Sequence, residues 1–392
     1  MTEETLDLWL PCTLDPATLP GNGERPARIA YLAHLLTVKP YDSSGYVRLN
    51  KMLLQKTISW KAEVLAFQYL KPHIETDGIY SPGKHSKGYR WGKPYYGQSA
   101  IRHPFKCHRL AERLRMIDAE TRSTYTDIER ALDADLENVT LPINLDKFLR
   151  TLPPKESVKS EQHRRNVIHA SGYDIQKGRS AIVSTSERTG RVHNSINRLS
   201  SRLREHLELC GEPVLEIDLA SSQPFFLATL FPSLALRDAV SCGEFYSRVN
   251  EQLASPVDFS DREAYAAFKT SILAILYARP IHGYDYTQSL NWRHRDSLVA
   301  IEKAYPGIIS FIEKYRSCHG DTALPVALQR LESSVFIDGA LMTLQGMGIP
   351  AVPIHDSILC RVRDAGIVEG IIYDKLLETT QLEPTLNKSK IA

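Results

Sequence analysis

The 392-residue sequence lacks a long apolar run, a paired-cysteine pattern and a strong net charge. No apolar stretch approaches the ~20 residues of a membrane span, so we expect no membrane among its partners. The six cysteines are scattered without a CxxC pair, which argues against a zinc site or a disulfide framework and favours a reducing compartment. The first residues are acidic and broken by proline, unlike a signal or transit peptide. We therefore expect a cytoplasmic protein.

The formal net charge is only +2, but the basic residues are unevenly distributed. Lys, Arg and His crowd the segments 84–115 and 177–204, and Tyr and Trp are interspersed in the first of them. A single cluster of this kind is as often a solvated surface as a binding surface. Two clusters together favour contact with the phosphate backbone of a nucleic acid.

The length and the 43% hydrophobic content suit two or three globular domains. We divide the chain into an N-terminal basic domain, a helical connector and a C-terminal domain with a helical insertion at about 240–325. Their predicted bounds are 1–105, 106–185 and 186–392. The order of strand, long helical insertion and strand pair predicts an α+β fold, with a small antiparallel sheet, helices behind it and a helical subdomain in front.

The N-terminal domain is predicted to be mainly helical. Helices are expected at 29–38, 49–57 and 61–70. A hairpin follows, with strands at 78–80 and 87–91 and a turn at 81–84. Two helices before a basic hairpin resemble a winged helix, whose wing would contact nucleic acid through Lys84, Lys87 and Arg90. A small structural domain with an exposed basic hairpin is an equal alternative.

Between the domains, the polar stretch 147–190 is predicted to be a connector. A helix is predicted at 196–209, before a strand at 214–218. Ser221 is expected to cap the helix that follows, because serine is favoured at that position and proline is tolerated in the first turn. Further helices are expected at 261–278, 294–303, 306–317, 324–347 and 366–379.

Two aspartates end apolar strands far apart in the sequence: Asp218 closes 214–218, and Asp356 lies within 351–360. Either one alone is more simply a cap or a turn residue. If the two strands pair, however, the carboxylates come within a few ångströms and repel each other unless a cation lies between them. Such a pair suits two Mg²⁺ or Mn²⁺ ions that catalyse phosphoryl transfer.

The helix predicted at 261–278 places Arg262, Lys269, Leu273 and Tyr277 on one face. The side chains of Arg262 and Lys269 are able to hold a triphosphate, and the Tyr277 ring is able to pack on a base. The alternative is an ordinary amphipathic helix with a lysine that reaches out to solvent. The two aspartates favour the first interpretation.

Five segments resemble family A DNA polymerases, in the same order along the chain. The segment 218–228 resembles their first catalytic motif. Lys269, followed at +8 by Tyr277, resembles the nucleotide-binding fingers helix. His355-Asp356-Ser357 resembles the third motif, in the form found in single-subunit phage-type RNA polymerases. Thr189-Gly190-Arg191, with Asn197 downstream, and the segment 305–314 agree with this family as well.

The resemblance implies a right-hand polymerase fold, with a palm, helical fingers and a small thumb. Asp218 and Asp356 would be the metal-binding carboxylates, and Lys269 the catalytic cation. Nucleotide contacts would come from Arg262, Gln223, Leu273 and Tyr277. Primer and template contacts would come from Thr189, Arg191, Asn197 and His355. The implied partners are nucleoside triphosphates and primer–template DNA, with RNA as an alternative, and we expect a monomer.

Several positions depart from the family pattern. Tyr265 stands where the family has arginine, so Arg262 would replace it, and Gln223 stands where a glutamate obstructs a 2′-hydroxyl. Leu273 and Ser357 differ as well. These changes leave RNA polymerase or primase-like synthesis open beside DNA synthesis. A non-catalytic DNA-binding replication factor with a relic palm and a metal-dependent nuclease also stay open. A stripped-down polymerase of this kind suits a phage or mobile element.

Overall fold

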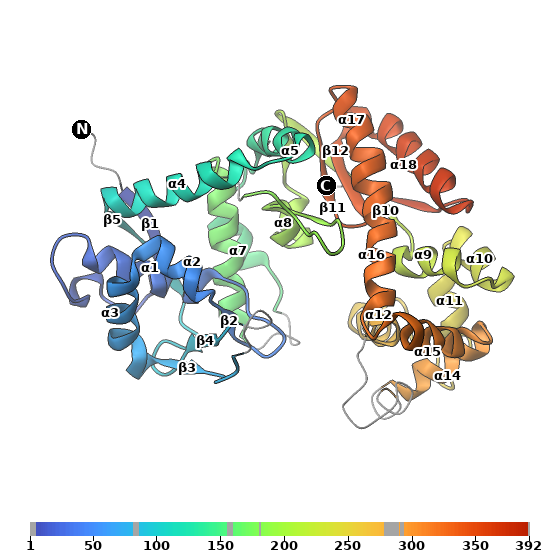
Figure 1. Cartoon of the computed structure of the whole chain (residues 1–392), viewed down its shortest axis with the longest axis horizontal. Coiled ribbons are helices and arrows are strands. Elements are labelled where there is room, and N and C mark those ends of the chain that lie inside the picture. The colour runs from blue at the N-terminus through green and yellow to red at the C-terminus, as the bar shows by residue number, and fades with distance from the viewer. Residues whose placement is uncertain are drawn as a thin grey trace. The chain divides into compact units, whose positions relative to one another are not determined.

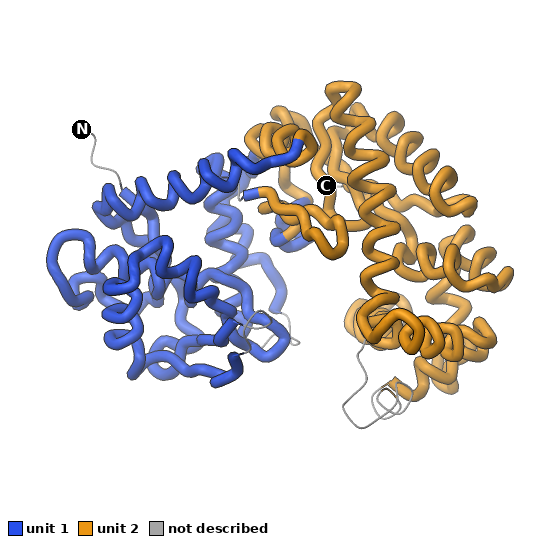
Figure 2. Tube along the Cα trace, viewed as in Figure 1, with its two compact units in different colours: residues 1–126, 140–182, 198–204 blue, residues 127–139, 183–197, 205–392 orange. Residues whose placement is uncertain are grey.

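The computed structural model of the protein describes residues 5–80, 86–154, 160–179, 182–277, 290 and 294–390. These residues form a mixed α+β structure (Figure 1). The chain divides into two compact units (Figure 2): unit 1 comprises residues 1–126, 140–182 and 198–204, and unit 2 comprises residues 127–139, 183–197 and 205–392. The predicted connector 106–185 is therefore shared between them. No helix among the described residues is both long and apolar enough to cross a lipid bilayer.

Unit 1 combines helices with two small antiparallel sheets, ordered β1-β5 and β2-β4-β3. Its elements are β1 (Thr5–Pro11), η1 (Pro16–Thr18), α1 (Arg25–Val38), β2 (Val47–Arg48), α2 (Lys51–Ile58), α3 (Trp60–Leu70), η2 (Lys71–His73), β3 (Ile74–Thr76), β4 (Gly88–Trp91), β5 (Ala100–Lys106), α4 (His108–Ser123), α6 (Leu145–Thr151), α7 (Glu161–Gln176) and α8 (Ser201–Arg204). α1 is central, because it packs against β1, α3 and α7. Its buried Thr37 accepts a hydrogen bond from the Trp91 indole at 3.1 Å, which ties the second sheet to this helix.

The three helices predicted in the N-terminal domain are present as α1, α2 and α3. The predicted hairpin differs, because β4 pairs with β3 at 74–76 and not with 78–80. Asp77 follows β3, and its carboxylate accepts hydrogen bonds from the Ile79 and Gly88 N–H groups, both at 3.1 Å. The predicted turn, with Lys84, lies outside the described residues. The order helix, strand, helix, helix, strand, strand agrees with a winged helix, and that assignment stays a prediction.

The polar stretch 147–190, predicted to be a connector, contains a packed helix, α7, so that prediction is wrong. α7 contacts α1 and α6. The His163 ring stacks on Tyr41 with 3.6 Å between centroids, and its Nε2 lies 2.8 Å from the Lys39 carbonyl oxygen. The polar sequence conceals this packing, because His163 and Asn166 share the buried face with the few apolar residues of the helix.

Unit 2 contains the largest sheet and most of the later helices. Its elements are α5 (Asp127–Glu137), β7 (Ser184–Thr185), β8 (Val192–His193), β9 (Glu208–Leu209), β10 (Glu212–Leu219), α9 (Ser222–Leu230), α10 (Leu234–Ser241), α11 (Phe245–Asn250), α12 (Arg262–Tyr277), α14 (Arg295–Ala304), α15 (Ile308–His319), α16 (Ala323–Val335), the π-helix η4 (Phe336–Leu341), α17 (Met342–Gly346), β11 (Ala351–Ile354), β12 (Ser357–Arg361), η5 (Val362–Asp364), α18 (Ala365–Thr380) and β13 (Leu386–Lys390). Two short elements, β6 (Val139–Thr140) and η3 (Ile196–Arg198), cross the boundaries between the units.

The sheet of unit 2 follows the order β11-β12-β10-β9-β6, and β13 also pairs with β10. β10 is central, and Ile217 and Leu359 at its pairing with β12 are fully buried. α18 packs on β10 and β12. The pairings of β10 with β9, β12 and β13 and of β11 with β12 are all antiparallel, as predicted.

Near the sheet, one prediction is wrong and one strand was missed. Residues 196–209 form η3, α8 and β9 in place of one helix, because Cys210 and Gly211 both have positive φ and turn β9 back onto β10. The last strand, β13, was not predicted at all. Its sequence, Leu-Asn-Lys-Ser-Lys, has a single apolar residue and so no strand-like apolar pattern.

Candidate active site

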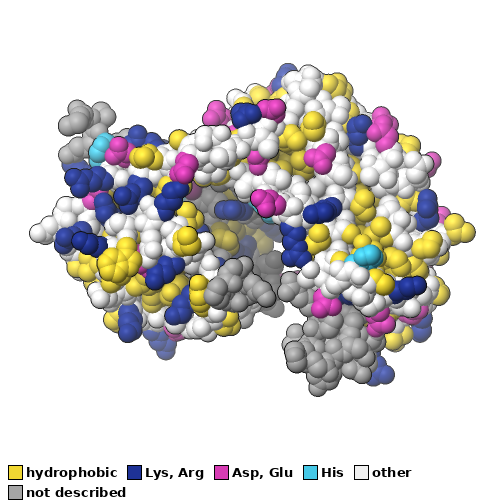
Figure 3. All heavy atoms as spheres, viewed as in Figure 1, with side chains coloured by type: hydrophobic (Ala, Val, Ile, Leu, Met, Phe, Trp, Pro, Cys, Tyr) yellow, Lys and Arg dark blue, Asp and Glu magenta, His cyan; other side chains and the backbone are white. Residues whose placement is uncertain are grey.

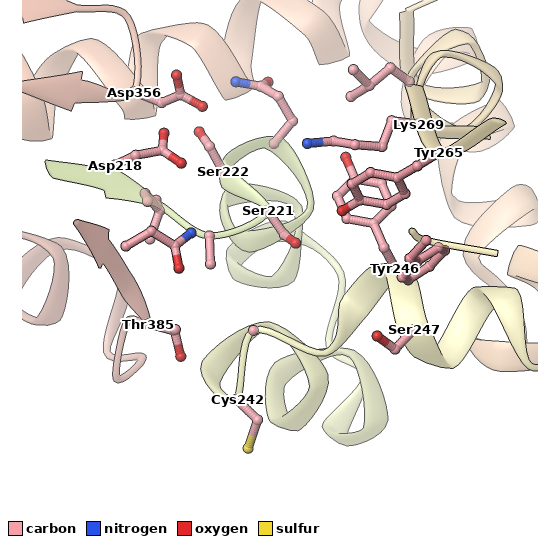
Figure 4. Close-up of a pocket in the computed structure, with 17 residues that line it drawn as sticks. Asp218, Ser221, Ser222, Cys242, Tyr246, Ser247, Tyr265, Lys269, Asp356 and Thr385 are labelled. Atoms are coloured by element: carbon pink, nitrogen blue, oxygen red, sulfur yellow. The ribbon is translucent and has the colours of Figure 1, made fainter. Parts of the chain in front are cut away.

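The two candidate carboxylates lie at neighbouring ends of paired strands. β10 and β12 are antiparallel with Asp218 opposite Ser357, and the Leu219 N–H donates to the Asp356 carbonyl at 3.1 Å. His355, with φ of 57°, makes the sharp turn from β11 towards β12. Figure 4 shows both carboxylates directed into the same space. The predicted pairing of the two strands is confirmed.

A cavity of about 390 Å³ opens in front of these carboxylates. One side is formed by the end of β10 and the start of α9, and the opposite side by α11 and α12 (Figure 4). Its lining residues are Asp218, Leu219, Ala220, Ser221, Ser222, Gln223, Cys242, Gly243, Tyr246, Ser247, Phe259, Tyr265, Lys269, Leu273, Asp356, Thr385 and Asn387. The cavity therefore brings together five residues predicted from the sequence: Asp218, Gln223, Lys269, Leu273 and Asp356.

Both carboxylates resist ionisation. Burial is the main cause that raises the pKa of Asp218 to about 7, and the charges of Asp356 and Glu216 raise it as well. Burial also raises the pKa of Asp356. The Lys269 ammonium acts in the opposite direction on the pKa of Asp218. Two desolvated carboxylates of this kind gain most from a divalent cation bound between them.

Lys269 extends from α12 towards the cavity (Figure 4). Its ammonium lies 5.1 Å from the ring centroid of Tyr246 and 5.4 Å from that of Tyr265, so two aromatic faces hold it by cation–π contacts. Leu273, one turn further, also lines the cavity. Arg262 is exposed at the start of α12 and is not among the described lining residues, whereas Tyr265 is. The predicted face of α12 is thus only partly directed at the cavity.

A second polar network lies beside the cavity and centres on Glu332 of α16. Arg191 donates to this carboxylate through Nε at 2.7 Å and Nη2 at 2.8 Å. The Gln223 amide also donates to it, and the Tyr277 hydroxyl donates to Gln223 Oε1. The Glu332 side chain is only 1% exposed. Arg191, predicted to contact primer or template, is therefore engaged by an internal carboxylate.

The Thr189-Gly190-Arg191 segment packs on α16. Gly190 has φ of 72°, and a Cβ atom there would meet the Cβ of Ser333 at 3.0 Å. Thr189 Oγ1 accepts a hydrogen bond from the Arg191 N–H at 3.4 Å. Glycine is required at this turn both for its left-handed backbone and for its close approach to the helix. The turn places Arg191 against Glu332.

Asn197 and His355 lie where the loop after β8 meets β11. Asn197 Oδ1 accepts from the Asn194 N–H at 3.0 Å, and the Asn194 side chain donates to the Pro353 carbonyl at 3.1 Å. The rings of His193 and His355 form an edge-to-face contact with 6.2 Å between centroids. These contacts give Asn197 a structural role in the loop. Contact of Thr189, Asn197 and His355 with nucleic acid stays a prediction.

Several residues of the site were not predicted. Asn387 of β13 lies opposite Asp218, and its side-chain hydrogen bond lowers the pKa of that carboxyl against the larger effect of burial. Tyr246 holds Lys269, and Glu216 accepts a hydrogen bond from the Ser357 hydroxyl at 2.7 Å. Only Glu216 had a usable signal, because it lies two residues before Asp218 and shares its strand face.

Ser221 precedes α9 as predicted but does not cap it. Its φ of 53° is left-handed, and its side chain makes no capping hydrogen bond. It lines the cavity instead. The strained backbone of Ser221 thus lies directly at the site, where such conformations are often retained.

In unit 1, the residues predicted to contact nucleic acid differ in their surroundings. Arg90 pairs with Glu75 at 2.7 Å and lies over the Tyr46 ring at 4.7 Å. Lys87 is exposed, and Lys84 lies outside the described residues. Figure 3 shows Lys and Arg side chains spread over the visible face of unit 1, with hydrophobic side chains between them. A role for this face in nucleic-acid binding stays a prediction.

The chemistry of the site fits a divalent metal that is shared with a substrate. No group of three or more His, Cys, Asp or Glu side chains forms a complete metal site within the described ranges. Mg²⁺, however, usually needs only one or two carboxylates and completes its shell with water and substrate phosphates. Asp218 and Asp356 supply that smaller donor set, and Lys269 adds a positive charge to the same cavity.

No protein-family model matches the chain, and no curated protein matches it either. Among solved structures it is similar to the POL domain of Pol1 from M. smegmatis, determined in complex with DNA primer-template and dNTP. The similarity covers 70% of this chain and 65% of that chain, at 13% sequence identity and a TM-score of 0.38. The chain thus spans less than two thirds of that structure's length. A likeness this distant carries no functional argument, so the function has to be inferred from the geometry of the site.

Proposed function

We propose that the protein is a template-directed nucleotidyl transferase that extends a primer and releases pyrophosphate. One observation carries this proposal: the carboxylates of Asp218 and Asp356, at paired strand ends, share a cavity with the ammonium of Lys269. Phosphoryl transfer requires anionic metal ligands near the reacting hydroxyl and positive charge near the leaving group. This cavity combines both.

Each residue has a distinct role in the proposed reaction. Asp218 and Asp356 would hold two Mg²⁺ or Mn²⁺ ions, whose positive charge would supply activation of the primer 3′-hydroxyl and stabilisation of the leaving pyrophosphate. In this proposal Lys269 binds the triphosphate, and its ammonium gives a proton to the departing pyrophosphate. The rings of Tyr246 and Tyr265 restrict where that ammonium points.

The proposed nucleotide site extends from Lys269 towards Gln223. Leu273 of α12 lies on the cavity wall, and Tyr277 is joined to Gln223 by a hydrogen bond. We propose primer–template DNA and deoxynucleoside triphosphates as the substrates, following the resemblance to family A DNA polymerases. Synthesis of RNA, in the manner of an RNA polymerase or a primase, is the alternative, because Gln223 replaces the family's sugar-excluding glutamate.

Primer extension tests the proposal directly. A labelled primer on a DNA template is incubated with deoxy- or ribonucleoside triphosphates and Mg²⁺ or Mn²⁺. We expect stepwise extension by the wild-type protein, none by Asp218→Asn, and normal extension by Asp374→Asn, a matched change at an exposed aspartate of α18. No extension with either nucleotide set and either metal would refute the enzyme proposal.

The same assay separates two rival functions. A metal-dependent nuclease would shorten the primer or template without added nucleotides, and substitution of Lys269 would leave that cleavage intact. A non-catalytic replication factor would bind DNA but show no extension, and Mn²⁺ would not raise its melting temperature. An intact metal site predicts stabilisation by Mn²⁺, because a ligand that binds only the folded state stabilises it.

A further inference from the structure

The strongest unassigned feature is the buried carboxylate of Glu332. It is 1% exposed and receives hydrogen bonds from Arg191, Gln223 and, at 3.5 Å, Ser222. Gln223 and Ser222 both line the cavity. Glu332 therefore contacts two residues of the proposed reaction site. Burial raises the pKa of Glu332, and the bidentate guanidinium of Arg191 opposes that rise and favours the ionised carboxylate.

An ionised carboxylate accepts hydrogen bonds and donates none. Gln223 must therefore turn its amide nitrogen towards Glu332, which leaves its Oε1 pointing away. Oε1 in turn accepts the hydroxyl hydrogen of Tyr277. The charge of Glu332 thus fixes the direction of two successive hydrogen bonds, from α16 through α9 to the end of α12.

We propose that Glu332 is a positioning residue that orients Gln223 and Tyr277 for the sugar of the incoming nucleotide. With Oε1 and one amide hydrogen occupied, the remaining amide hydrogen of Gln223 is a donor at the cavity wall, and a sugar hydroxyl oxygen is its natural acceptor. Glu332 itself does not touch the substrate. This inference rests on the proposed nucleotidyl transfer, and it adds a residue that determines nucleotide affinity and sugar choice.

The test compares nucleotide kinetics among variants of the full chain in primer extension. Glu332→Gln keeps the shape but frees the Gln223 amide to rotate. We expect KM for the nucleotide to rise about tenfold, the scale of a lost charge-assisted hydrogen bond, with a smaller change in kcat and an altered ratio of deoxy- to ribonucleotide incorporation. Tyr277→Phe should act in the same direction. Because both act through Gln223, the double variant should be little worse than either single one.

A swap of the two side chains controls for a variant that simply folds poorly. Gln223→Glu places two carboxylates together and should lower activity, whereas Gln223→Glu combined with Glu332→Gln restores one donor and one acceptor and should recover much of it. Glu378→Gln, at an exposed glutamate of α18 paired with Lys375, is the matched control and should resemble wild type.

The outcomes distinguish the two proposals. Absence of extension by the wild-type protein would overturn both. Normal extension, with nucleotide KM and sugar preference unchanged in Glu332→Gln, would overturn the inference alone and leave Glu332 as a structural ion-pair partner. A swap variant no better than Gln223→Glu, or fully multiplicative effects of Glu332→Gln and Tyr277→Phe, would contradict it as well.

Discussion

Two clusters of charged groups, one in each unit, lie in opposite settings. In unit 1, Arg102 and Arg179 both contact Asp7, at 2.8 and 3.3 Å, and each arginine side chain is more than 40% exposed. In unit 2, Asp218 and Asp356 are desolvated beside each other, and burial raises the pKa of both. Balanced and solvated charges indicate a surface, whereas desolvated like charges indicate a site that binds a ligand. The number of charges alone does not make this distinction.

The largest expected effect on nucleotide incorporation comes from removal of one carboxylate charge from the pair formed by Asp218 and Asp356. Asp356→Asn should reduce nucleotide incorporation by more than about a hundredfold, because a neutral amide is a poor ligand for Mg²⁺. Steady-state primer extension measures the effect. Asp7→Asn in unit 1 is the matched control and should retain activity. Equal losses in the two variants would break the contrast between the units.

The turn that places Arg191 against Glu332 offers a second, smaller effect. Gly190→Ala should lower the free energy of unfolding by roughly 2–3 kcal/mol, because strained φ and the contact with Ser333 both oppose a Cβ atom. Gly211 has a similar φ of +75° but no neighbour within 4 Å, so Gly211→Ala should cost only about 1 kcal/mol. Urea unfolding of both variants measures the difference. Equal costs would show that the close approach to α16 is unimportant.

The raised pKa of Asp218 predicts a pH-dependent gain in stability when its charge is removed. The folded protein retains a proton that the unfolded chain releases as pH rises from the ordinary pKa of 3.8 to about 7, so wild-type stability falls across that window. Without metal, Asp218→Asn should therefore be more stable than wild type by roughly 1–3 kcal/mol near pH 8, and about equal near pH 4. Urea unfolding in a chelator provides the measurement. A gain in stability that does not increase with pH would contradict the conclusion that Asp218 and Asp356 are desolvated beside each other.

The smallest effect is expected at the exposed pair of unit 1. Arg90→Ala should change stability by less than about 1 kcal/mol, because Arg90 and Glu75 are partly solvated. If Arg90 also contacts nucleic acid, the substitution should reduce the salt dependence of binding by about one phosphate contact. Fluorescence anisotropy across a salt titration measures this. An unchanged slope would exclude Arg90 from the interface.

The strands β10, β11 and β12 of unit 2 could be predicted from the sequence, because Asp218 and Asp356 lie at the ends of clear apolar runs that are able to pair in one sheet. Most of the later helices of unit 2, such as α9, α12 and α18, were predicted as well, whereas α10 and α11 were not. β13 and α7 could not be predicted, since a polar strand and a polar buried face carry no apolar period. Glu332 was missed because a glutamate on an amphipathic helix looks like a solvated residue until tertiary packing buries it. The strands that carry the two aspartates can therefore be recognised from the local sequence, whereas the polar network around Glu332 exists only in the folded chain.

Binding of Mn²⁺, followed by electron paramagnetic resonance in the presence of a nucleoside triphosphate, tests the central claim most directly. We expect the wild-type protein and Asp374→Asn to bind the ion, and Asp218→Asn and Asp356→Asn each to lose that binding. Wild-type binding that persists unchanged in both single variants would mean that the two aspartates do not share a metal, and the account would fail.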